Sequence, residues 1–394
     1  MVNLVVYTEN YFHGGLEKFI FDLLESKDIN VHIIVNYQNN RIIEFARNNK
    51  ISYTTVDLVN YKINAETTPL IYKKIIKIIN FFLHNIYMIP NYFKVKNILK
   101  NLNSYRNILI VNGGYPAAVS CFSTALAAKN SQFKNIGLSV LSSPSPNYKN
   151  KIFKFFQLKL DLFFDKSINL YLPNSNNIKE KLISTVGLNQ NKIKTVYTGI
   201  KMPSKIITSD ILKYNTSILK KQQGEIWIGM LGLLGSTKRQ DLIIDVLEKL
   251  DKHVKLLLVG DGPKMKFLMD KVVSLELEDR VIFTGWMSDV HNVYSFLDMV
   301  VFVSDQEGLP YAVSEAMSYK VPVVASNVGG ISEQIIHGVG GLLIENNKED
   351  IIENVNRLIG NRELQNNYVN YSFNRVRDLF STVSMNNQIV GLYK

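Results

Sequence analysis

Two carboxylates, Glu307 and Glu315, stand on either side of Pro310. The apolar run 299–304 before them predicts a strand that is buried on both faces of a parallel sheet. Proline suits the first turn of a helix, because its missing N–H would have no partner there. The unpaired N–H groups of that turn, with the positive end of the helix dipole, can bind an anion. An anion site flanked by carboxylates suits a ligand that carries both phosphate and hydroxyl groups, such as a nucleotide-sugar.

A second group of chemically useful residues lies between the first predicted strand, 3–7, and the first predicted helix, 16–25. Gly14 and Gly15 fill this junction, with His13 before them. Glycines at such a junction let the backbone approach a phosphate or an acceptor closely, although a plain tight turn accounts for the same pair. His13 suits either a general base or a surface turn. We expect His13, Gly14 and Gly15 to form an acceptor or phosphate loop.

These residues need a scaffold that brings the ends of several strands together. The first half of the chain alternates apolar strands with amphipathic helices, which is typical of a doubly wound parallel sheet. The expected strands span 3–7, 31–35, 108–111, 136–141, 170–175 and 193–196, and the expected helices span 16–25, 42–49, 117–128 and 177–185. Ligands bind at the C-terminal edge of such a sheet.

A polar stretch, residues 201–224, is typical of a linker and separates this half from a second alternating series. The second series has expected strands at 226–231, 254–259, 281–284, 299–304, 321–326 and 341–344, and expected helices at 239–249, 265–275, 348–359 and 364–393. At 394 residues the chain exceeds one ordinary domain. The sequence therefore predicts two α/β units, each built on a parallel sheet.

Composition and the single cysteine limit the class of protein. The chain is 46% hydrophobic and 20% charged, as in a globular protein. Cys121 has no second cysteine to pair with, which is compatible with a reducing compartment. The sequence has no run of about 18 or more apolar residues, and it enters a strand without a basic leader. We therefore expect a cytoplasmic protein with neither a transmembrane helix nor a secretion signal.

Positive charge is concentrated in one part of the N-terminal half. The net charge is +11, from 45 basic and 34 acidic residues. Residues 67–160 contain 13 Lys and Arg and no Asp or Glu, so the remainder has 32 basic against 34 acidic residues, a net charge of −2. A bias toward Lys codons accounts for a basic composition, but less readily for 94 residues without a carboxylate. Such a field attracts anionic lipid, nucleic acid or phosphorylated substrates.

Two segments, 70–106 and 148–166, combine lysines with aromatic and aliphatic residues. In the first, Lys73, Lys77 and His84 recur at helical spacing on an otherwise apolar helix. A basic amphipathic helix can lie in a membrane interface, and a core helix with a solvated edge has the same pattern. The second segment favours membrane contact. We expect an anionic membrane surface as a partner and no nucleic acid, because the sequence has neither an RNA-binding signature nor a Cys/His metal module.

The ordered motifs resemble those of the retaining glycosyltransferases of family 4, which have the GT-B fold. The matching stretches include GGLEKFIFDLL, LPNSNNIKEKL and KIKTVYTGI before the linker, and GMLGLLGSTKRQDLIIDVL, LLLVGDGPKMKFL and EGLPYAVSEAMSYKVPVVASNVGG after it. The family's paired glutamates correspond to Glu307 and Glu315. The resemblance implies an α/β, GT-B fold with two Rossmann-like domains facing a cleft. Residues 1–200 would bind the acceptor, residues 201–375 would bind the nucleotide-sugar, and a helix at 376–394 would pack back on the N-terminal domain.

The resemblance also assigns roles in the second half of the chain. Glu307 would hold hydroxyls of the donor sugar and Lys238 would neutralise the diphosphate, so these two are the expected catalytic residues. Glu315 would hold the ribose hydroxyls. The other expected donor-binding residues are Gly232, Arg239, Gly285, Trp286, Gly308, Leu309, Pro310 and Tyr311. Retention in this family is ascribed to front-face attack, with the leaving phosphate accepting the proton of the acceptor. We therefore expect no metal and no other cofactor.

Two departures from the family's pattern concern the phosphate and acceptor contacts. The family usually has an arginine where this chain has Leu233, and leucine does not pair with a diphosphate. Arg239 is the available substitute. Many members have a histidine after the strand expected at 136–141, whereas this chain has SSPS at residues 142–145.

Two functional hypotheses follow. The first is an enzyme that transfers a sugar from a nucleotide-sugar to a hydroxyl of a glycan, which we expect to be lipid-linked, in the biosynthesis of bacterial surface polysaccharide, lipopolysaccharide or capsule. The basic, aromatic N-terminal half fits a peripheral position on the inner face of the cell membrane. The second is a degenerate glycosyltransferase that binds or scaffolds in a glycan assembly complex. The missing arginine and histidine favour the second hypothesis, and Glu307, Glu315 and Lys238 favour the first.

Overall fold

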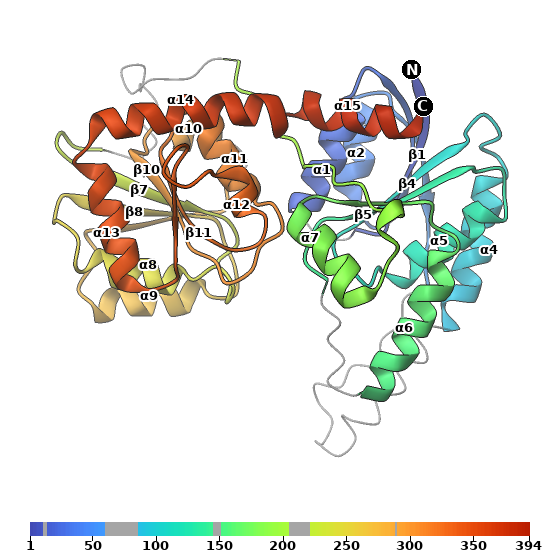
Figure 1. Cartoon of the computed structure of the whole chain (residues 1–394), viewed down its shortest axis with the longest axis horizontal. Helices are drawn as coiled ribbons and strands as arrows, with labels where there is room; N and C mark the ends of the chain where they lie inside the picture. The colour runs from blue at the N-terminus through green and yellow to red at the C-terminus, as the bar shows by residue number, and fades with distance from the viewer. Residues whose placement is uncertain (11–13, 60–85, 145–150, 205–220, 288–289) are drawn as a thin grey trace. The chain divides into compact units, whose positions relative to one another are not determined.

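The structure is a computed structural model that describes residues 1–10, 14–59, 86–144, 151–204, 221–287 and 290–394 (Figure 1). The chain divides into two compact units. Unit 1 comprises Met1–Val196 with Asn386–Lys394, and unit 2 comprises Tyr197–Met385. The chain therefore crosses between the units after Val196 and again after Met385, compared with the expected boundaries at 200 and 375.

Unit 1 is a six-stranded parallel sheet with helices between the strands. The strands are β1 (Val2–Thr8), β2 (Ile29–Asn36), β3 (Ser52–Val56), β4 (Asn107–Asn112), β5 (Asn135–Val140) and β6 (Leu170–Pro173). Their order across the sheet is β3-β2-β1-β4-β5-β6. The helices are α1 (Gly15–Leu24), α2 (Asn40–Asn48), α4 (Met88–Leu99), α5 (Val119–Lys129), α6 (Lys151–Asp165) and α7 (Asn176–Lys181). This strand order is that of a Rossmann-like fold.

Unit 2 repeats the same design. Its strands are β7 (Ile226–Leu231), β8 (Val254–Val259), β9 (Val281–Gly285), β10 (Met299–Phe302), β11 (Val323–Ser326) and β12 (Leu342–Ile344), in the order β12-β11-β10-β7-β8-β9. Its helices are α8 (Gln240–Leu247), α9 (Met265–Ser274), α10 (His291–Tyr294), α11 (Tyr311–Ser318), α12 (Ile331–Gln334), α13 (Lys348–Ile359) and α14 (Arg362–Leu379). The prediction of two doubly wound α/β sheets is confirmed.

The central strands of both sheets are continuous apolar runs, because helices cover the sheets on both faces. In β1, Leu4 and Val5 are fully buried, and in β10 Val300 is fully buried. In unit 1 the core continues into the helices, where the rings of Phe122 and Phe164 stack with centroids 4.6 Å apart.

Two strands of unit 1 differ from the sequence prediction. The strand β3 was not expected, because its sequence SYTTV is polar and only Val56 is buried at this edge of the sheet. The expected strand at 193–196 is wrong: this stretch makes an isolated bridge between Tyr171 and Ile193. The N–H of Val196 donates to the carbonyl oxygen of Pro173 (2.9 Å), but proline has no N–H to continue the ladder.

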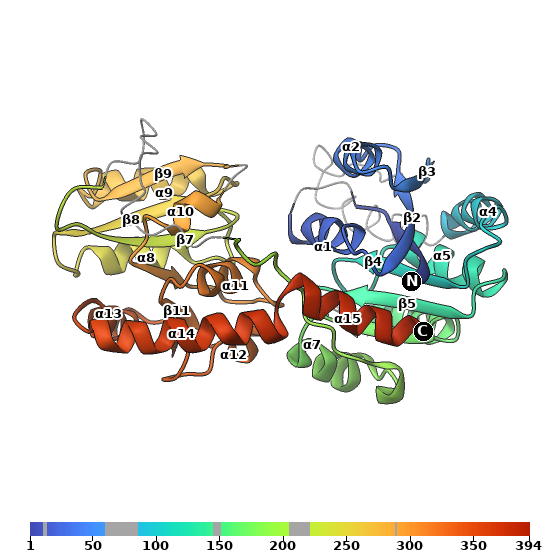
Figure 2. The same ribbon diagram turned by 90° about the horizontal axis from the view of Figure 1, so that it is seen from above.

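The C-terminal stretch forms two helices where one was expected. Between α14 and α15 (Thr382–Tyr393) the backbone of Ile200 accepts from Thr382 N (2.9 Å) and donates to Phe380 O (2.8 Å). This pairing interrupts the helix. The last residues of α15 belong to unit 1, where the hydroxyl of Tyr393 donates to the carbonyl oxygen of Ile108 (3.3 Å). Figures 1 and 2 show α15 beside the strands of the first sheet.

Among the described residues, no helix combines the length and the hydropathy that a membrane span requires. Several residues named in the sequence analysis, His13, Lys73, Lys77 and His84, lie outside the described residues.

Candidate functional site

The site in unit 2 begins at the point where the strand order of the sheet reverses. β7 is first in the chain, and its two neighbours are β8 on one side and β10 on the other. The chain connections on the two sides of this point run in opposite directions along the sheet. They leave a crevice between them at the C-terminal ends of β7 and β10. The loops that follow these two strands, 232–239 and 303–310, carry the two expected catalytic residues.

Lys238 and Glu307 meet at this crevice. The Lys238 Nζ and the Glu307 Oε1 form an ion pair between the two loops. Their side chains are 20% and 9% exposed, so the pair is partly shielded from water. The ammonium also lies 4.6 Å from the ring centroid of Phe302 at the end of β10. The structure therefore places a cation and a carboxylate side by side at the reversal point.

Backbone contacts hold the two loops together. The N–H of Asp305 donates to the carbonyl oxygen of Thr237 (2.8 Å), and the Ser304 hydroxyl donates to the same oxygen (2.9 Å). Thr237 precedes Lys238, and Asp305 is two residues before Glu307. Hydrogen bonds next to each residue of the Lys238–Glu307 pair therefore hold the two loops in place.

The glycine turn after β11 contacts the backbone of the loop that carries Glu307. Gly330 N donates to the carbonyl oxygen of Gly308 (2.7 Å). Gly329 has a φ of +58°, and a Cβ atom at this position would clash with the carbonyl oxygen of Glu307. Only glycine combines this left-handed backbone with such a close approach. The turn therefore fixes the backbone of the loop that carries the carboxylate.

The start of α11 follows directly. Pro310 is the residue before the first helical turn, with φ −68° and ψ 127°, and Tyr311 is the first helical residue. We expected Pro310 to lie in the first turn of the helix, and this is off by one residue. The extended ψ of Pro310 is incompatible with a helical position, so the proline caps the helix. The buried Gln334 of α12 donates to the carbonyl oxygen of Pro310 (3.0 Å) and to the hydroxyl of Ser314 (2.6 Å). Leu309 is 5% exposed and anchors the loop in the core.

Glu315 projects from the second turn of α11 and is oriented by a residue that the sequence analysis missed. The hydroxyl of Tyr294 donates to Glu315 Oε2 (2.9 Å). Tyr294 is 1% exposed, and burial, with the nearby carboxylate of Glu315, raises its pKa well above the ordinary value. The tyrosine therefore stays protonated and serves as a fixed donor. Nothing in the sequence around Tyr294 signals this role, because the contact spans 21 residues.

Arg239 and Leu233 bear on the missing phosphate contact. Arg239 has a φ of +22° and stands directly before α8. Its Nε lies 3.3 Å from Asp241 Oδ1 and its Nη1 lies 3.3 Å from Asp305 Oδ1. Hydrogen bonding to Asp241 raises the pKa of the guanidinium. Leu233 is 61% exposed, and its carbonyl oxygen accepts from the buried side chain of Gln240 (3.0 Å).

Glycines at the C-terminal ends of β7, β8 and β9 bring the remaining expected donor residues to the same sheet edge. Gly260 N donates to the carbonyl oxygen of Gly285 (3.0 Å), and a Cβ on Gly260 would clash with the carbonyl oxygen of Gly232. Gly285 has a φ of +69°, which lets the strand turn. Trp286 follows and is 63% exposed. An exposed indole at this edge can stack on a planar ring.

The corresponding edge of unit 1 carries the expected acceptor turn. Gly14 has a φ of +152° and precedes α1, whose first residue is Gly15. Strand order in unit 1 reverses between β1 and β4. There the hydroxyl of Ser120, in the first turn of α5, donates to the carboxylate of Glu9, which follows β1. Glu9 and Ser120 were not singled out from the sequence, because neither lies in a motif.

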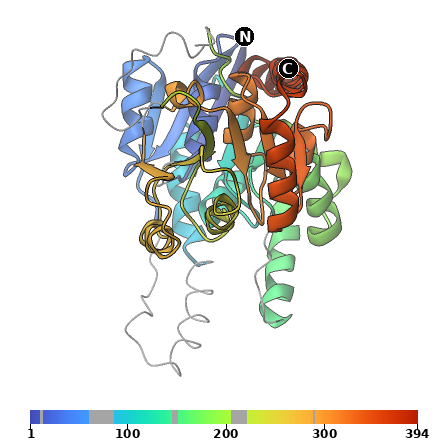
Figure 3. The ribbon, with the colours of Figure 1, turned by 90° about the vertical axis from the view of Figure 1, so that its left-hand side faces the viewer.

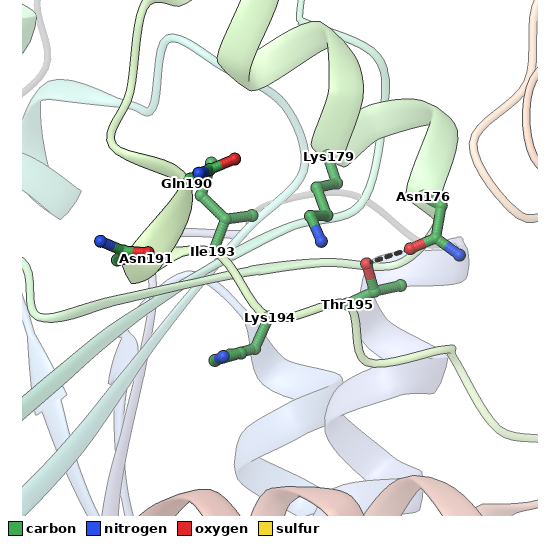
Figure 4. A pocket seen from close by; sticks show the side chains of 7 residues that line it. All are labelled: Asn176, Lys179, Gln190, Asn191, Ile193, Lys194 and Thr195. Atoms are coloured by element: carbon green, nitrogen blue, oxygen red, sulfur yellow. Dashed lines mark hydrogen bonds between the residues drawn. The ribbon is translucent and has the colours of Figure 1, made fainter.

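A further pocket lies in unit 1, away from these residues (Figure 4). It is an open depression of about 590 Å³. Its lining comes from α7 and from the stretch that follows it: Asn176, Lys179, Gln190, Asn191, Ile193, Lys194 and Thr195. The Thr195 hydroxyl donates to Asn176 Oδ1 (2.7 Å). The lining is polar and basic, and none of the seven residues is a carboxylate.

Metal ligands do not gather in the part of the chain that the structure describes: no group of three or more His, Cys, Asp or Glu residues is placed to hold an ion.

Comparison with known proteins identifies the class to which unit 2 belongs. Residues 215–375 match the family described as Glycosyl transferases group 1. This range contains β7 to β12 and all the donor-site residues described above. The chain therefore carries a glycosyl transferases group 1 domain.

Individual relatives are similar over part of the chain. N-acetyl-alpha-D-glucosaminyl L-malate synthase of Bacillus anthracis is 31% identical over 159 residues, 40% of this chain and 42% of the relative. O-antigen biosynthesis glycosyltransferase WbnH of Escherichia coli is 29% identical over 178 residues, 45% of this chain and 46% of the relative. The chain thus spans about half the length of these curated relatives.

Solved structures match over the whole chain. HepE of Anabaena, crystallised in complex with UDP-glucose, has a TM-score of 0.76 at 19% identity, and the match covers 99% of both chains. The lipopolysaccharide outer core galactosyltransferase WaaB has a TM-score of 0.69 at 18% identity, covering 100% of this chain and 99% of the other. These likenesses establish the fold. The expectation of a GT-B fold with two Rossmann-like units is confirmed.

Proposed function

We propose that the protein is a retaining glycosyltransferase of family 4 that transfers a sugar from a nucleotide-sugar to a hydroxyl of a glycan. The observation that carries this proposal is the ion pair of Lys238 and Glu307 at the reversal point of the second sheet. The group 1 domain over residues 215–375 supports it. The pair would offer a cation to the diphosphate and a carboxylate to the sugar hydroxyls of a nucleotide-sugar.

The charges of the site match the parts of the donor. Lys238 would contact the diphosphate and stabilise the negative charge that develops on it as the sugar leaves. Glu307 would accept hydrogen bonds from hydroxyls of the sugar, and Glu315, oriented by Tyr294, would accept them from the ribose. Gly308, Leu309, Pro310 and Tyr311 would present backbone groups to the sugar or phosphate. Gly232, Gly285 and Trp286 would border the nucleotide.

We take the chemical step from the resemblance to family 4. The bond between the anomeric carbon and the diphosphate oxygen breaks, and the electron pair leaves with the diphosphate. The acceptor hydroxyl attacks the same face and forms the new glycosidic bond, while its proton passes to the leaving phosphate oxygen. This route retains the anomeric configuration and needs neither a protein base nor a metal ion.

The acceptor is proposed to be a lipid-linked glycan of a bacterial surface polysaccharide, such as lipopolysaccharide or capsule. Similar proteins include WbnH, named for O-antigen biosynthesis, and the Vi polysaccharide biosynthesis protein VipC/TviE of Salmonella typhi. Gly14 and Gly15 would bind or border the acceptor in unit 1. The protein would act in the cytoplasm as a peripheral protein on the inner face of the membrane.

A catalytically degenerate binding or scaffold protein is the second candidate. The exposed Leu233 in place of a phosphate-binding arginine favours it, as does the engagement of Arg239 by Asp241 and Asp305.

The deciding experiment measures donor binding and donor hydrolysis with a panel of nucleotide-sugars. We expect turnover with one donor, and loss of turnover in Glu307→Ala at an unchanged melting temperature. Glu333→Ala is the matched control, because Glu333 is a carboxylate of the same unit that hydrogen-bonds Tyr197 instead (3.0 Å). Donor binding without turnover would support the scaffold. If no donor binds, or if Glu307→Ala keeps the wild-type rate, the proposed role of the site is wrong.

A further inference from the structure

The outward face of α6 mixes aromatic, aliphatic and basic side chains. Phe155, Lys159 and Leu162 recur at intervals of four and three residues, so they share one face of the helix, and the exposed Lys166 directly follows its last residue. Phe155 is 58% exposed, Leu162 48% and the adjacent Phe163 53%. The Lys159 Nζ lies 5.5 Å from the ring centroid of Phe155. Half-exposed phenylalanines interleaved with lysines are unusual on a face that meets only water.

The carboxylates of α6 point the other way. Asp161 is 4% exposed. Asp165 pairs with Lys192 (2.8 Å) and accepts from the hydroxyl of Tyr171 (3.1 Å) on the inner side. Over residues 155–165, both negative charges of the helix therefore lie on its inner side, and Lys159 lies on its outer side.

Helix α4 adds a second exposed apolar stripe. Ile86, just before the helix, and Ile89 and Phe93 within it stand at intervals of three and four residues. They are 56%, 61% and 58% exposed. The opposite side of the helix is in the core, where Val95 and Leu99 are fully buried. Packing of α4 against the core therefore does not account for the exposed apolar stripe.

The first turns of both helices lie near the edge of unit 1 that we propose to bind the acceptor. Asn91, in the first turn of α4, holds the segment after β3 by two hydrogen bonds, to the N–H (2.8 Å) and the carbonyl oxygen (3.1 Å) of Val59. Tyr87 and Asn91 line a small cavity together with Glu9 and Ser120, which follow β1 and β4. Figures 1 and 3 show the first turns of α4 and α6 on the same side of unit 1.

The charge of this part of the chain selects the partner. Residues 67–160 contain 13 basic residues and no carboxylate. Of the lysines on α4, Lys94 pairs with Asp57 (3.7 Å) and Lys96 donates to the hydroxyl of Tyr92 (3.0 Å). An equally basic copy of the same face would repel it, whereas an anionic surface attracts it.

We propose that the exposed faces of α4 and α6 form one docking surface for an anionic lipid bilayer. The inference deepens the membrane attachment in the proposed function and rests on it. Isoleucine, leucine and phenylalanine side chains would enter the boundary between headgroups and acyl chains. Lys159 and Lys166 would lay their aliphatic stems along the same face and reach anionic headgroups. Docking there would bring the acceptor edge of unit 1 to the membrane surface.

Vesicle binding by the full-length protein tests this surface. We expect it to co-sediment with vesicles of phosphatidylglycerol and phosphatidylcholine in equal parts, and much less with phosphatidylcholine alone. Phe155→Ser with Leu162→Ser should weaken vesicle binding by about tenfold or more, because two side chains that would insert into the bilayer are lost. Ile89→Ser with Phe93→Ser should do the same, and Lys159→Glu with Lys166→Glu should abolish the preference for the anionic lipid.

Phe267→Ser is the matched control. Phe267 is 50% exposed on α9 of unit 2 and also has a lysine over its ring, with Lys264 Nζ 4.6 Å from the centroid. This change should leave vesicle binding unaltered. The assay contains no donor, and every variant is also tested for donor binding and by thermal melting. A failed transferase proposal and a failed docking proposal therefore give different results.

Three outcomes would overturn the docking surface. The first is a wild-type protein that ignores the phosphatidylglycerol vesicles or binds pure phosphatidylcholine equally well. The second is wild-type binding by both the α4 and the α6 variants. The third is a wild-type dimer in lipid-free buffer that these changes convert to a monomer, since the face would then join two copies of the chain.

Discussion

The ion pair between Lys238 and Glu307 predicts that one substitution has opposite effects on two related ligands. In the free protein the carboxylate of Glu307 holds the ammonium that a diphosphate must contact. Glu307→Gln keeps the shape of the side chain and removes its charge. Lys238 is then released from a competing partner. We expect Glu307→Gln to tighten binding of the free nucleoside diphosphate and to weaken binding of the complete nucleotide-sugar.

The size of each effect follows from the geometry. Lys238 is 20% exposed, so releasing it from its partner is worth about 1 kcal/mol, or about fivefold in affinity for the diphosphate. Glu307 is 9% exposed, and replacing its charged hydrogen bonds to sugar hydroxyls by neutral ones costs about 1.5 to 3 kcal/mol. Both ligands contact Lys238, so its release favours both, and the nucleotide-sugar is weakened only by the difference between the two terms. The ratio of the two affinities should therefore change by the sugar term alone, roughly 10- to 150-fold.

Isothermal titration calorimetry measures both affinities with the donor found in the panel and with its nucleoside diphosphate. Lys238→Gln is the paired control, because it removes the cation that both ligands share and should weaken both by the same factor. Thermal melting confirms that each variant is folded. If Glu307→Gln changes both affinities by the same factor, the carboxylate does not contact the sugar and the assignment is refuted.

Three further predictions concern other parts of the molecule. Gly329→Ala should lower the free energy of unfolding by about 2 to 4 kcal/mol in denaturant titrations, because the new Cβ strains the backbone and clashes with Glu307. The control is Gly338→Ala, at φ +73° with open space around it, which should cost only about 1 kcal/mol. Equal losses in the two variants would contradict the clash. Leu233→Arg should tighten diphosphate binding about tenfold by calorimetry, and unchanged affinity would show that the loop does not face the phosphates. Burial lowers the pKa of His32, so the unfolded state binds a proton more readily than the folded state. The free energy of unfolding should therefore fall as pH drops below about 6.5, by at most about 2 kcal/mol at pH 5. In denaturant titrations at pH 7.5 and 5, His32→Asn should reduce this dependence on pH, and an unchanged dependence would assign it to other groups.

Most of the fold could be predicted from sequence because the relevant signals are local. The strand 254–259 and the helix 348–359 were predicted with the bounds that β8 and α13 have. The strand is a continuous apolar run in the middle of a sheet. The helix has an N-terminal cap, since Asn347 Oδ1 accepts from Asp350 N (2.9 Å). Elements without such signals were missed, and β3 is a polar edge strand of this kind.

The site could be predicted only as far as its motifs reach. Lys238 and Glu307 are separated by 69 residues, and their contact required the assumption that β7 and β10 are neighbours. The resemblance supplied that assumption. Tyr294 behind Glu315 could not be found in this way, because its partner is fixed by packing of α10 against α11 and not by spacing. The engagement of Arg239 by Asp305 likewise depends on how two loops pack.

The double crossing of the chain determines the order in which the units can be completed during synthesis. Residues 197–385 form unit 2 without interruption, whereas unit 1 includes residues 386–394. Those last residues include Tyr393, which is 3% exposed and occupies the space that a side chain at Gly137 would need. A ribosome releases the first 196 residues long before the segment that completes their core. Unit 2 is therefore ready to close first, and the half of the protein that is made first is finished last.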